Sequence, residues 1–252
     1  MTDIQLLPDE RIDQLYSQTV KIIQSSSVFA FSLDAVLLAM FAKASKSTKS
    51  LTVDLCAGNG AVGLFFAHKT NGQIVEVEIQ PRLADMAKRS ISLNHLESKM
   101  QVLNIDLADS LKYLHHDSID TVLCNPPYFT DLPKSVKNPN QFLAIARHEI
   151  KTNLEMICKV TSQLLKTNGK IYMVHRPDRL LDIITTMQKF NLAPKQIQFV
   201  HSKKNKEANI VLIEAIKNGQ QTGLRIIKPL IVYEDDGQYT SEVHEALYGK
   251  TK

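Results

Sequence analysis

The chain has 252 residues, enough for one large α/β domain or two small ones, and its 44% hydrophobic and 22% charged residues are ordinary for a folded protein. No apolar run approaches the about 20 residues that a membrane-spanning helix needs, and the acidic N-terminus does not look like a signal peptide, so we expect a cytoplasmic protein. Cys56, Cys124 and Cys158 are too few and too scattered for a disulfide framework or a zinc site, and we expect no metal. The net charge of +4 is too small to establish a nucleic-acid partner.

Apolar residues recur every three or four positions between Leu33 and Phe41, which predicts an amphipathic helix with Ser32 as its N-cap. Farther along the chain, short apolar or alternating segments are interleaved with segments of helical periodicity. We expect strands at residues 51–55, 73–79, 100–105, 118–124 and 169–175. We expect helices at residues 60–68, 81–91 and 141–166. This order implies βαβ units, and therefore an α/β fold whose parallel sheet binds its ligand at the carboxyl ends of the strands.

The first of these strands runs into a glycine-rich turn in which Gly58, Gly60 and Gly63 form a GxGxxG pattern. Such a turn suits a dinucleotide, because glycines let the backbone approach a ligand closely and the following helix N-terminus favours an anion. Asp54 argues against a pyrophosphate, which its carboxylate in the crevice would repel, whereas it would complement a ligand that carries an ammonium and a sulfonium. The charge pattern therefore favours S-adenosylmethionine, and we assign Asp54, Gly58, Asn59 and Gly60 to cofactor binding.

Two further acids follow the next two predicted strands. Glu78 ends the second strand, where a carboxylate can accept hydrogen bonds from both ribose hydroxyls. Asp106 ends the third strand, where it can accept a hydrogen bond from the adenine amino group. Either acid alone is explained as a solvated residue at a strand end, but three acids at successive strand ends beside a glycine turn favour a cofactor site. We expect a single domain over residues 1–252, in which residues 1–50 form an N-terminal extension packed near this site.

The fourth strand leads into the loop Asn125-Pro126-Pro127-Tyr128-Phe129. The nitrogen of an amide or aromatic amine is a poor nucleophile, because its lone pair is delocalised into the adjoining π-system. If the Asn125 side-chain oxygen and the Pro126 carbonyl each accept an N–H bond, the lone pair turns toward the methyl group, and both acceptors stabilise the charge that develops on nitrogen. We therefore assign Asn125, Pro126, Pro127 and Tyr128 to catalysis.

This loop and six other short segments resemble those of class I S-adenosylmethionine-dependent methyltransferases with an NPPY motif, in particular the bacterial tRNA1(Val) adenine-N6 methyltransferase family. The segments are residues 22–25, 31–39, 54–60, 77–80, 125–129, 146–149 and 174–177. The resemblance implies a Rossmann-like, seven-stranded, mostly parallel sheet with helices on both faces. It also implies methyl transfer to N6 of the adenosine just 3′ of the anticodon of a tRNA. The chain departs from general methyltransferases at Cys56, where they favour glycine.

On the substrate side, we expect Tyr128 and Phe129 to stack on the target base, and Arg176, Lys203 and Lys204 to contact RNA phosphates. A solvated loop explains the lysines about equally well. Two other functions stay open. A glutamine-N5 methyltransferase acting on a release factor would present the same planar NH2 group to the loop, and a non-catalytic module would bind S-adenosylmethionine or RNA without chemistry. The sequence indicates no oligomeric state.

Overall fold

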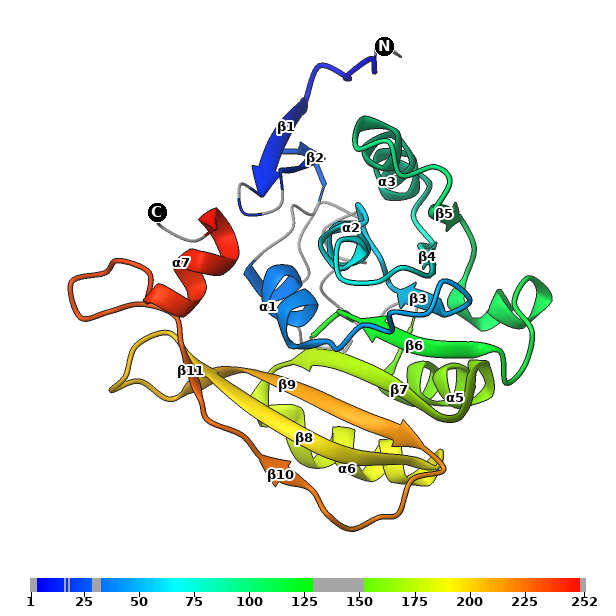
Figure 1. Cartoon of the computed structure of the whole chain (residues 1–252), viewed down its shortest axis with the longest axis vertical. Coiled ribbons are helices and arrows are strands. Elements are labelled where there is room, and N and C mark those ends of the chain that lie inside the picture. The colour runs from blue at the N-terminus through cyan, green and yellow to red at the C-terminus, as the bar shows by residue number, and fades with distance from the viewer. Residues whose placement is uncertain (1–3, 16, 18, 29–32, 129–151, 250–252) are drawn as a thin grey trace, which may run out of the picture.

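The computed structural model describes residues 4–15, 17, 19–28, 33–128 and 152–249. Within these residues the main sheet has nine strands, and seven of them form its body in the order β8-β9-β7-β6-β3-β4-β5 (Figure 1). In that order the seven are Leu192–His201, Ala208–Lys217, Leu165–His175, Ile119–Cys124, Leu51–Leu55, Gln73–Val77 and Met100–Leu103. Strand β9 is antiparallel to both of its neighbours, and the other pairings in the body are parallel. The predicted mostly parallel α/β sheet is confirmed, with the two-residue strands β10 (Arg225–Ile226) and β11 (Leu230–Ile231) added at β8.

Helices cover both faces of this sheet (Figure 1). One face carries α1 (Leu33–Phe41) and α2 (Ala61–Ala67), flanked by α3 (Pro81–Leu93) and α7 (Ser241–Tyr248). The opposite face carries α5 (Leu154–Leu164) and α6 (Leu180–Lys189). Two 3-10 helices, η2 (Leu107–Lys112) and η3 (Pro177–Arg179), follow β5 and β7. Successive residues of a strand therefore enter opposite cores: Val122 packs with α5 and α6, whereas Leu123 packs with α1 and α2.

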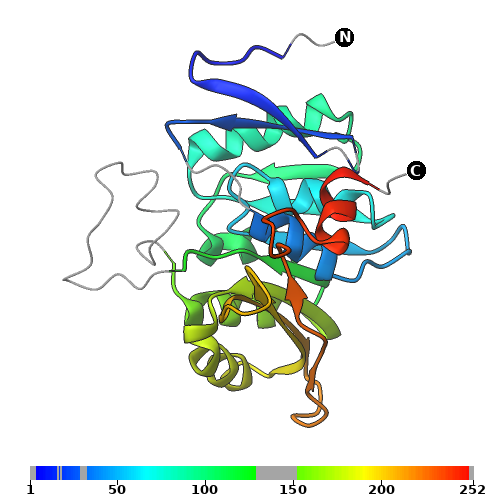
Figure 2. The same cartoon turned by 90° about the vertical axis from the view of Figure 1, so that its left-hand side faces the viewer.

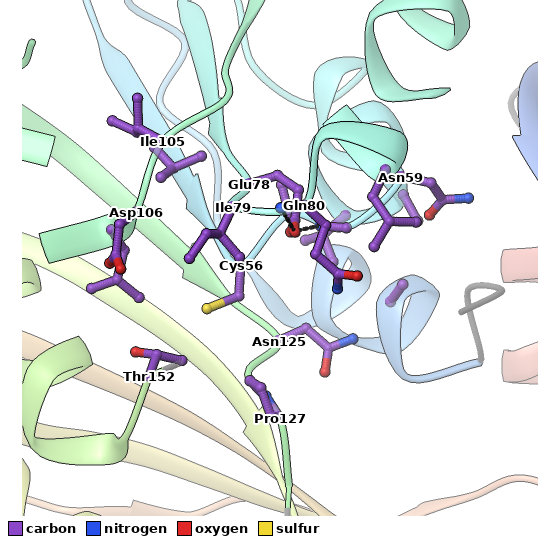
Figure 3. A pocket seen from close by; sticks show the side chains of 18 residues that line it. Cys56, Asn59, Glu78, Ile79, Gln80, Ile105, Asp106, Asn125, Pro127 and Thr152 are labelled. Carbon is purple, nitrogen blue, oxygen red and sulfur yellow. Dashed lines mark hydrogen bonds between the residues drawn. The ribbon is translucent and has the colours of Figure 1, made fainter. Parts of the chain in front are cut away.

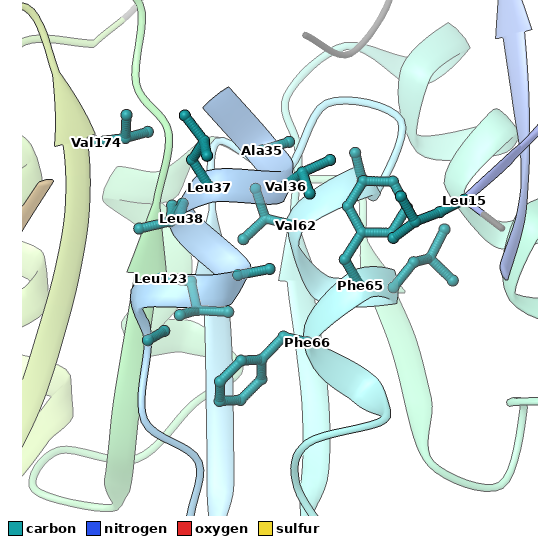
Figure 4. Packing of buried hydrophobic residues seen from close by; sticks show 14 of the residues in the cluster. Leu15, Ala35, Val36, Leu37, Leu38, Val62, Phe65, Phe66, Leu123 and Val174 are labelled. Atoms are coloured by element: carbon teal, nitrogen blue, oxygen red, sulfur yellow. The ribbon is translucent and has the colours of Figure 1, made fainter. Parts of the chain in front are cut away.

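The core between α1 and α2 holds both helices firmly on the sheet (Figure 4). Leu37 and Leu38 of α1 and Phe65 and Phe66 of α2 are at most 1% exposed. Burying such side chains contributes about 1.5–3 kcal/mol each. The turn before α2 is therefore anchored to one rigid unit.

An N-terminal hairpin of β1 (Glu10–Leu15) and β2 (Val20–Ser25), which the sequence reading did not predict, lies beside α3 (Figure 2). The Glu10 carboxylate accepts two hydrogen bonds of 2.7 Å from the Arg89 guanidinium. The backbone N–H of Ile23 donates to Ser90 Oγ at 2.9 Å. These contacts join the N-terminal segment to the helix that follows β4.

The predicted helix over residues 141–166 is confirmed between Leu154 and Leu164, and its described residues on either side of that range are not helical. Residues 141–151 lie outside the described residues, and Asn153 is extended, with φ −135° and ψ 168°. Its side chain accepts the N–H of Met156, so Asn153 caps α5 and the helix begins only at Leu154. The helix ends at Leu164, because Leu165 turns extended and pairs with Ile119 of β6. In the described parts of the chain, no helix combines the length and apolar character needed to cross a membrane.

Candidate active site

A pocket opens at the carboxyl ends of β3, β4, β5 and β6 (Figure 3). Six of the residues predicted to form the site line it together: Gly58, Asn59, Glu78, Asp106, Asn125 and Pro127. Its walls also include apolar side chains that suit a planar base, namely Val62, Ile79, Leu83, Ile105 and Leu107. Thr152, two residues before α5, also lines the pocket (Figure 3). The βαβ topology has thus gathered side chains from four strand ends into one cavity.

Glu78 is the best-defined polar group in this pocket. It is 5% exposed, its Oε2 accepts the backbone N–H of Gly58, and its Oε1 accepts that of Gln80, both at 2.8 Å. Burial raises the pKa of Glu78, and the two backbone donors oppose that shift. Each carboxylate oxygen has a second lone pair, so the fixed carboxylate can still accept hydrogen bonds from a diol. The side-chain oxygen of Gln80, also in the wall, has no partner among the described residues.

The glycine turn has the backbone conformation that its residues predict. Gly58 has a φ of +60° with open space where a Cβ would be, and Gly60 has a φ of +84°. A Cβ on Gly60 would lie 2.7 Å from the Oε2 atom of Glu76, and one on Gly63 would lie 2.5 Å from its Oε1 atom. Cys56 also has a positive φ, +59°, which explains why glycine suits that position.

The predicted exposure of the Asp54 carboxylate to the crevice is wrong. Asp54 is fully buried, its Oδ2 accepts the backbone N–H of Gly63 at 2.9 Å, and it does not line the pocket. Burial, with a smaller contribution from the charge of Glu78, raises the pKa of Asp54 to about 8. A mostly protonated side chain beneath the turn supports the turn and gives no ion pair to a ligand. Gly60 does not line the pocket either.

Glu76 is a buried acid that the sequence reading missed. It pairs in register with Asp54 across β3 and β4, is fully buried, and has no hydrogen-bond partner for either oxygen among the described residues. Burial, together with the charges of Asp54 and Glu78, raises its pKa well above the ordinary value. Its carboxyl group fills the space that Gly60 and Gly63 leave open.

Asp106 lies where β5 leads into η2, and it lines the pocket. Its Oδ1 accepts the backbone N–H of Ala108 at 2.9 Å and so caps η2. This bond fixes the orientation of the carboxylate at the pocket wall. Its role toward an adenine amino group stays a prediction.

The loop after β6 brings only part of its motif to the pocket. Asn125 and Pro127 line the cavity, whereas Pro126 is buried and Tyr128 lies behind Asn125. The Tyr128 hydroxyl oxygen is 2.6 Å from Asp34 Oδ2 and 2.9 Å from Asn125 Oδ1. Burial and Asp34 raise the pKa of Tyr128 well above its usual value, so it remains a phenol. Phe129 lies outside the described residues.

One side of the Tyr128 ring is covered by His175, at the carboxyl end of β7, with ring centroids 5.2 Å apart and planes tilted by 44°. His175 is 1% exposed, and its Nδ1 accepts the backbone N–H of Arg176 at 2.8 Å. Burial, with a smaller contribution from Arg179, lowers the pKa of His175 to about 4, so the ring is neutral. In this arrangement Tyr128 packs on His175, and its predicted stacking on a base stays a prediction.

The predicted phosphate-contacting residues do not line the pocket, but they share its edge of the sheet. Arg176 follows β7, and Lys203 and Lys204 occupy the turn between β8 and β9. Because His175 pairs with Val211 near the start of β9, this turn lies at the carboxyl end of β7. The Lys203 ammonium donates to the Asp235 carbonyl at 3.0 Å, and Arg176 forms a 3.4 Å ion pair with Asp178.

Comparison with known proteins agrees with this geometry. Residues 19–200 match the family model described as the methyltransferase small domain. The chain is 26% identical over 215 residues to a tRNA1(Val) (adenine(37)-N6)-methyltransferase from Shewanella sp. (strain MR-4), covering 85% of this chain and 88% of the relative. It is 32% identical over 147 residues to the protein of that name from Bacteroides fragilis (strain YCH46), covering 56% of this chain and 57% of the relative.

Solved structures show the same fold. A predicted O-methyltransferase from Agrobacterium tumefaciens superposes with a TM-score of 0.67 at 23% identity, covering 86% of this chain and 96% of that one. TYW2 from M. jannaschii, in complex with AdoMet, gives a TM-score of 0.55 at 14% identity, covering 84% and 87%. The fold class and family that the motifs predicted are both confirmed, and the chain belongs to the methyltransferase small domain family.

Proposed function

We propose that this protein is an S-adenosylmethionine-dependent methyltransferase that acts on the N6 amine of an adenosine in tRNA, next to the anticodon. The observation that carries the proposal is that Asn125 lines the same pocket as Gly58, Glu78 and Asp106. A cofactor held by the latter three would therefore lie beside the amide of Asn125. The names of the relatives from Shewanella and Bacteroides support tRNA adenine as the substrate.

The pocket fits S-adenosylmethionine on its own features. The Glu78 carboxylate is held by two backbone donors and keeps lone pairs for the ribose hydroxyls. The unpartnered Gln80 oxygen offers another acceptor in the wall, and the open space at Gly58 lets a ligand approach the backbone. Asp106 offers a carboxylate for the adenine amine. When bound, the cofactor supplies an electrophilic methyl group attached to a sulfonium.

The chain's own residues prepare the acceptor amine. The Asn125 side-chain oxygen and the Pro126 carbonyl accept its two N–H bonds and weaken its conjugation with the base. Both acceptors gain strength as positive charge develops on nitrogen, so they favour the transition state over the ground state. The methylated amine then loses one proton to water, because the product ammonium is strongly acidic.

The basic residues on the same edge of the sheet suit an RNA that extends beyond the pocket. Lys203, Lys204 and Lys206 lie in the β8–β9 turn, and Arg176 lies after β7. Each phosphate contact releases counterions and strengthens RNA binding at low salt. A tRNA acceptor and these residues together agree with a cytoplasmic enzyme.

Glutamine-N5 methylation of a release factor is the alternative that the same loop would support. The two substrates are separated by offering purified protein and labelled S-adenosylmethionine either unmodified tRNA or a release-factor domain with its glutamine loop. We expect label in tRNA, recovered as N6-methyladenosine, and none in the protein domain. Label in the protein alone would overturn the tRNA assignment, and label in neither, with intact cofactor binding, would favour a non-catalytic module.

A further inference from the structure

Asp34, Tyr128 and Asn125 form a hydrogen-bonded chain that runs from α1 to the wall of the pocket. The Tyr128 hydroxyl oxygen lies 2.6 Å from the Asp34 carboxylate and 2.9 Å from the Asn125 amide. Asn125 lines the pocket, whereas Asp34 and Tyr128 do not. Within this pocket, Asp34 and Tyr128 can therefore act through the orientation of the Asn125 side chain.

The number of protons available decides which group donates and which accepts in each of these hydrogen bonds. A phenol carries one proton, and a carboxylate is an acceptor only. The contact with Asp34 is the shorter of the two, as expected of a charge-assisted bond, so it takes the proton of Tyr128. The phenolic oxygen then presents a lone pair to Asn125, and a lone pair is matched by the amide N–H2 group.

The oxygen and nitrogen of an amide have nearly equal size, so both orientations of the Asn125 side chain fill the same volume. The structure has the Asn125 oxygen toward Tyr128, so the phenol must share its one proton between Asp34 and Asn125, and the amide nitrogen has no hydrogen-bond partner among the described residues. With the nitrogen toward Tyr128, the amide donates to the phenolic oxygen, and its own oxygen is released on the other edge. His175 packs against the Tyr128 ring and holds the hydroxyl in place for this bond.

We propose that Asp34 is a positioning residue that, through Tyr128, turns the Asn125 amide so that its oxygen faces the substrate amine. The role of that oxygen rests on the proposed amino-methylation, whereas its orientation rests on the contacts of the three side chains. Asp34 itself does not line the pocket.

Two nearly isosteric variants make opposite changes to the chain. In Asp34→Asn the charge that holds the Tyr128 proton is lost and the new amide can donate to the phenolic oxygen; where it does, Tyr128 turns its proton to Asn125 and favours the unproductive orientation. If this orientation is favoured by the net free energy of one hydrogen bond, we expect kcat to fall about fivefold or more, with a smaller change in KM. Tyr128→Phe keeps the ring but leaves the amide unbiased, which predicts only about a twofold loss, because two equal orientations halve the productive population.

The double variant gives the decisive kinetic result. Tyr128→Phe removes the hydroxyl that holds Asn125 in the unproductive orientation. Adding it to Asp34→Asn should therefore raise the activity to the level of Tyr128→Phe alone. Cofactor affinity should change in none of these variants, and the exposed acid variant Glu97→Gln serves as the matched control. Additive losses in the double variant would mean that Asp34 acts through packing, and would overturn the proposal.

A measurement without turnover separates this proposal from the proposed function. In protein labelled with ¹⁵N-asparagine, the side-chain NH2 signal of Asn125 is identified by its absence from Asn125→Ala. We expect its exchange with solvent to be slow in the wild type and faster in both Asp34→Asn and Tyr128→Phe. Equal exchange in all three would overturn the positioning role, whereas a wild type inactive on tRNA with slowed exchange would count against the substrate only.

Discussion

Two acids, Asp54 and Glu76, lie side by side beneath the glycine turn. Because both are buried, the free energy of unfolding depends on pH. The pKa of Asp54 is raised from 3.8 to about 8, mainly by burial. Because the folded state holds this proton more tightly than the unfolded chain, its contribution to stability is complete below pH 4. It is lost as the pH rises toward 8. Asp54→Asn has no proton to lose and keeps an oxygen for the Gly63 N–H.

The size of this effect follows from the shift. Each pH unit between the unfolded pKa of 3.8 and the folded pKa of about 8 lowers the free energy of unfolding by about 1.4 kcal/mol. From pH 5 to pH 8 the loss is therefore about 4 kcal/mol. The charges of Asp54 and Glu76 act on each other, so we expect the stability advantage of Asp54→Asn over the wild type to grow by about 1–4 kcal/mol across this range. A comparison across pH cancels any constant cost of burying the amide.

Urea unfolding at half-unit steps from pH 5 to pH 8 measures this growth, with Glu97→Gln as the exposed control. The free energy of unfolding of Glu97→Gln should run parallel to that of the wild type. If the curve of Asp54→Asn also runs parallel to the wild type, Asp54 is ionised in the folded protein, and the account of the turn is wrong.

Three further variants test the pocket and its surroundings. Glu78→Ala should weaken cofactor binding by about 1.5–3 kcal/mol in calorimetry, the scale of hydrogen bonds to a charged group, and unchanged affinity would remove Glu78 from the ribose site. Asn125→Ala should keep cofactor affinity within a few fold but lose about 100-fold in single-turnover rate, by analogy with the loss of one oxyanion-hole donor. Replacing Lys203, Lys204 and Lys206 together with Gln should flatten the slope of log affinity against log salt by up to about 0.7 per lost phosphate contact, and an identical slope would return them to a solvated loop.

The residues that the sequence reading placed best are those whose position follows from strand periodicity and a local motif. Glu78, Asp106 and Asn125 end or follow predicted strands, and parallel strands bring their carboxyl ends to one edge. Asp54 was misplaced although the same periodicity contained the signal. Val53 and Leu55 pack toward α5 and α6, so Asp54 between them must point to the other face, under α2.

Other features depend on contacts that no local pattern encodes. Asp34 and Tyr128 lie 94 positions apart in the chain, and only the packing of α1 beside β6 and β7 brings them together. His175 has a role beside Tyr128 for the same reason. The start of α5 was misplaced because apolar periodicity runs across Asn153, while the N-cap that begins the helix is a single polar residue.

The central claim is that the pocket transfers methyl groups to the N6 amine of adenosine in tRNA. The most direct test is mass spectrometry of nucleosides from tRNA of a strain that lacks this gene, complemented with either the wild type or Asn125→Ala. We expect N6-methyladenosine next to the anticodon to disappear in the deletion strain, to return with the wild type, and to stay absent with Asn125→Ala at equal protein level. Undiminished N6-methyladenosine in the deletion strain would rule out this tRNA reaction, and its full return with Asn125→Ala would rule out the catalytic role of Asn125.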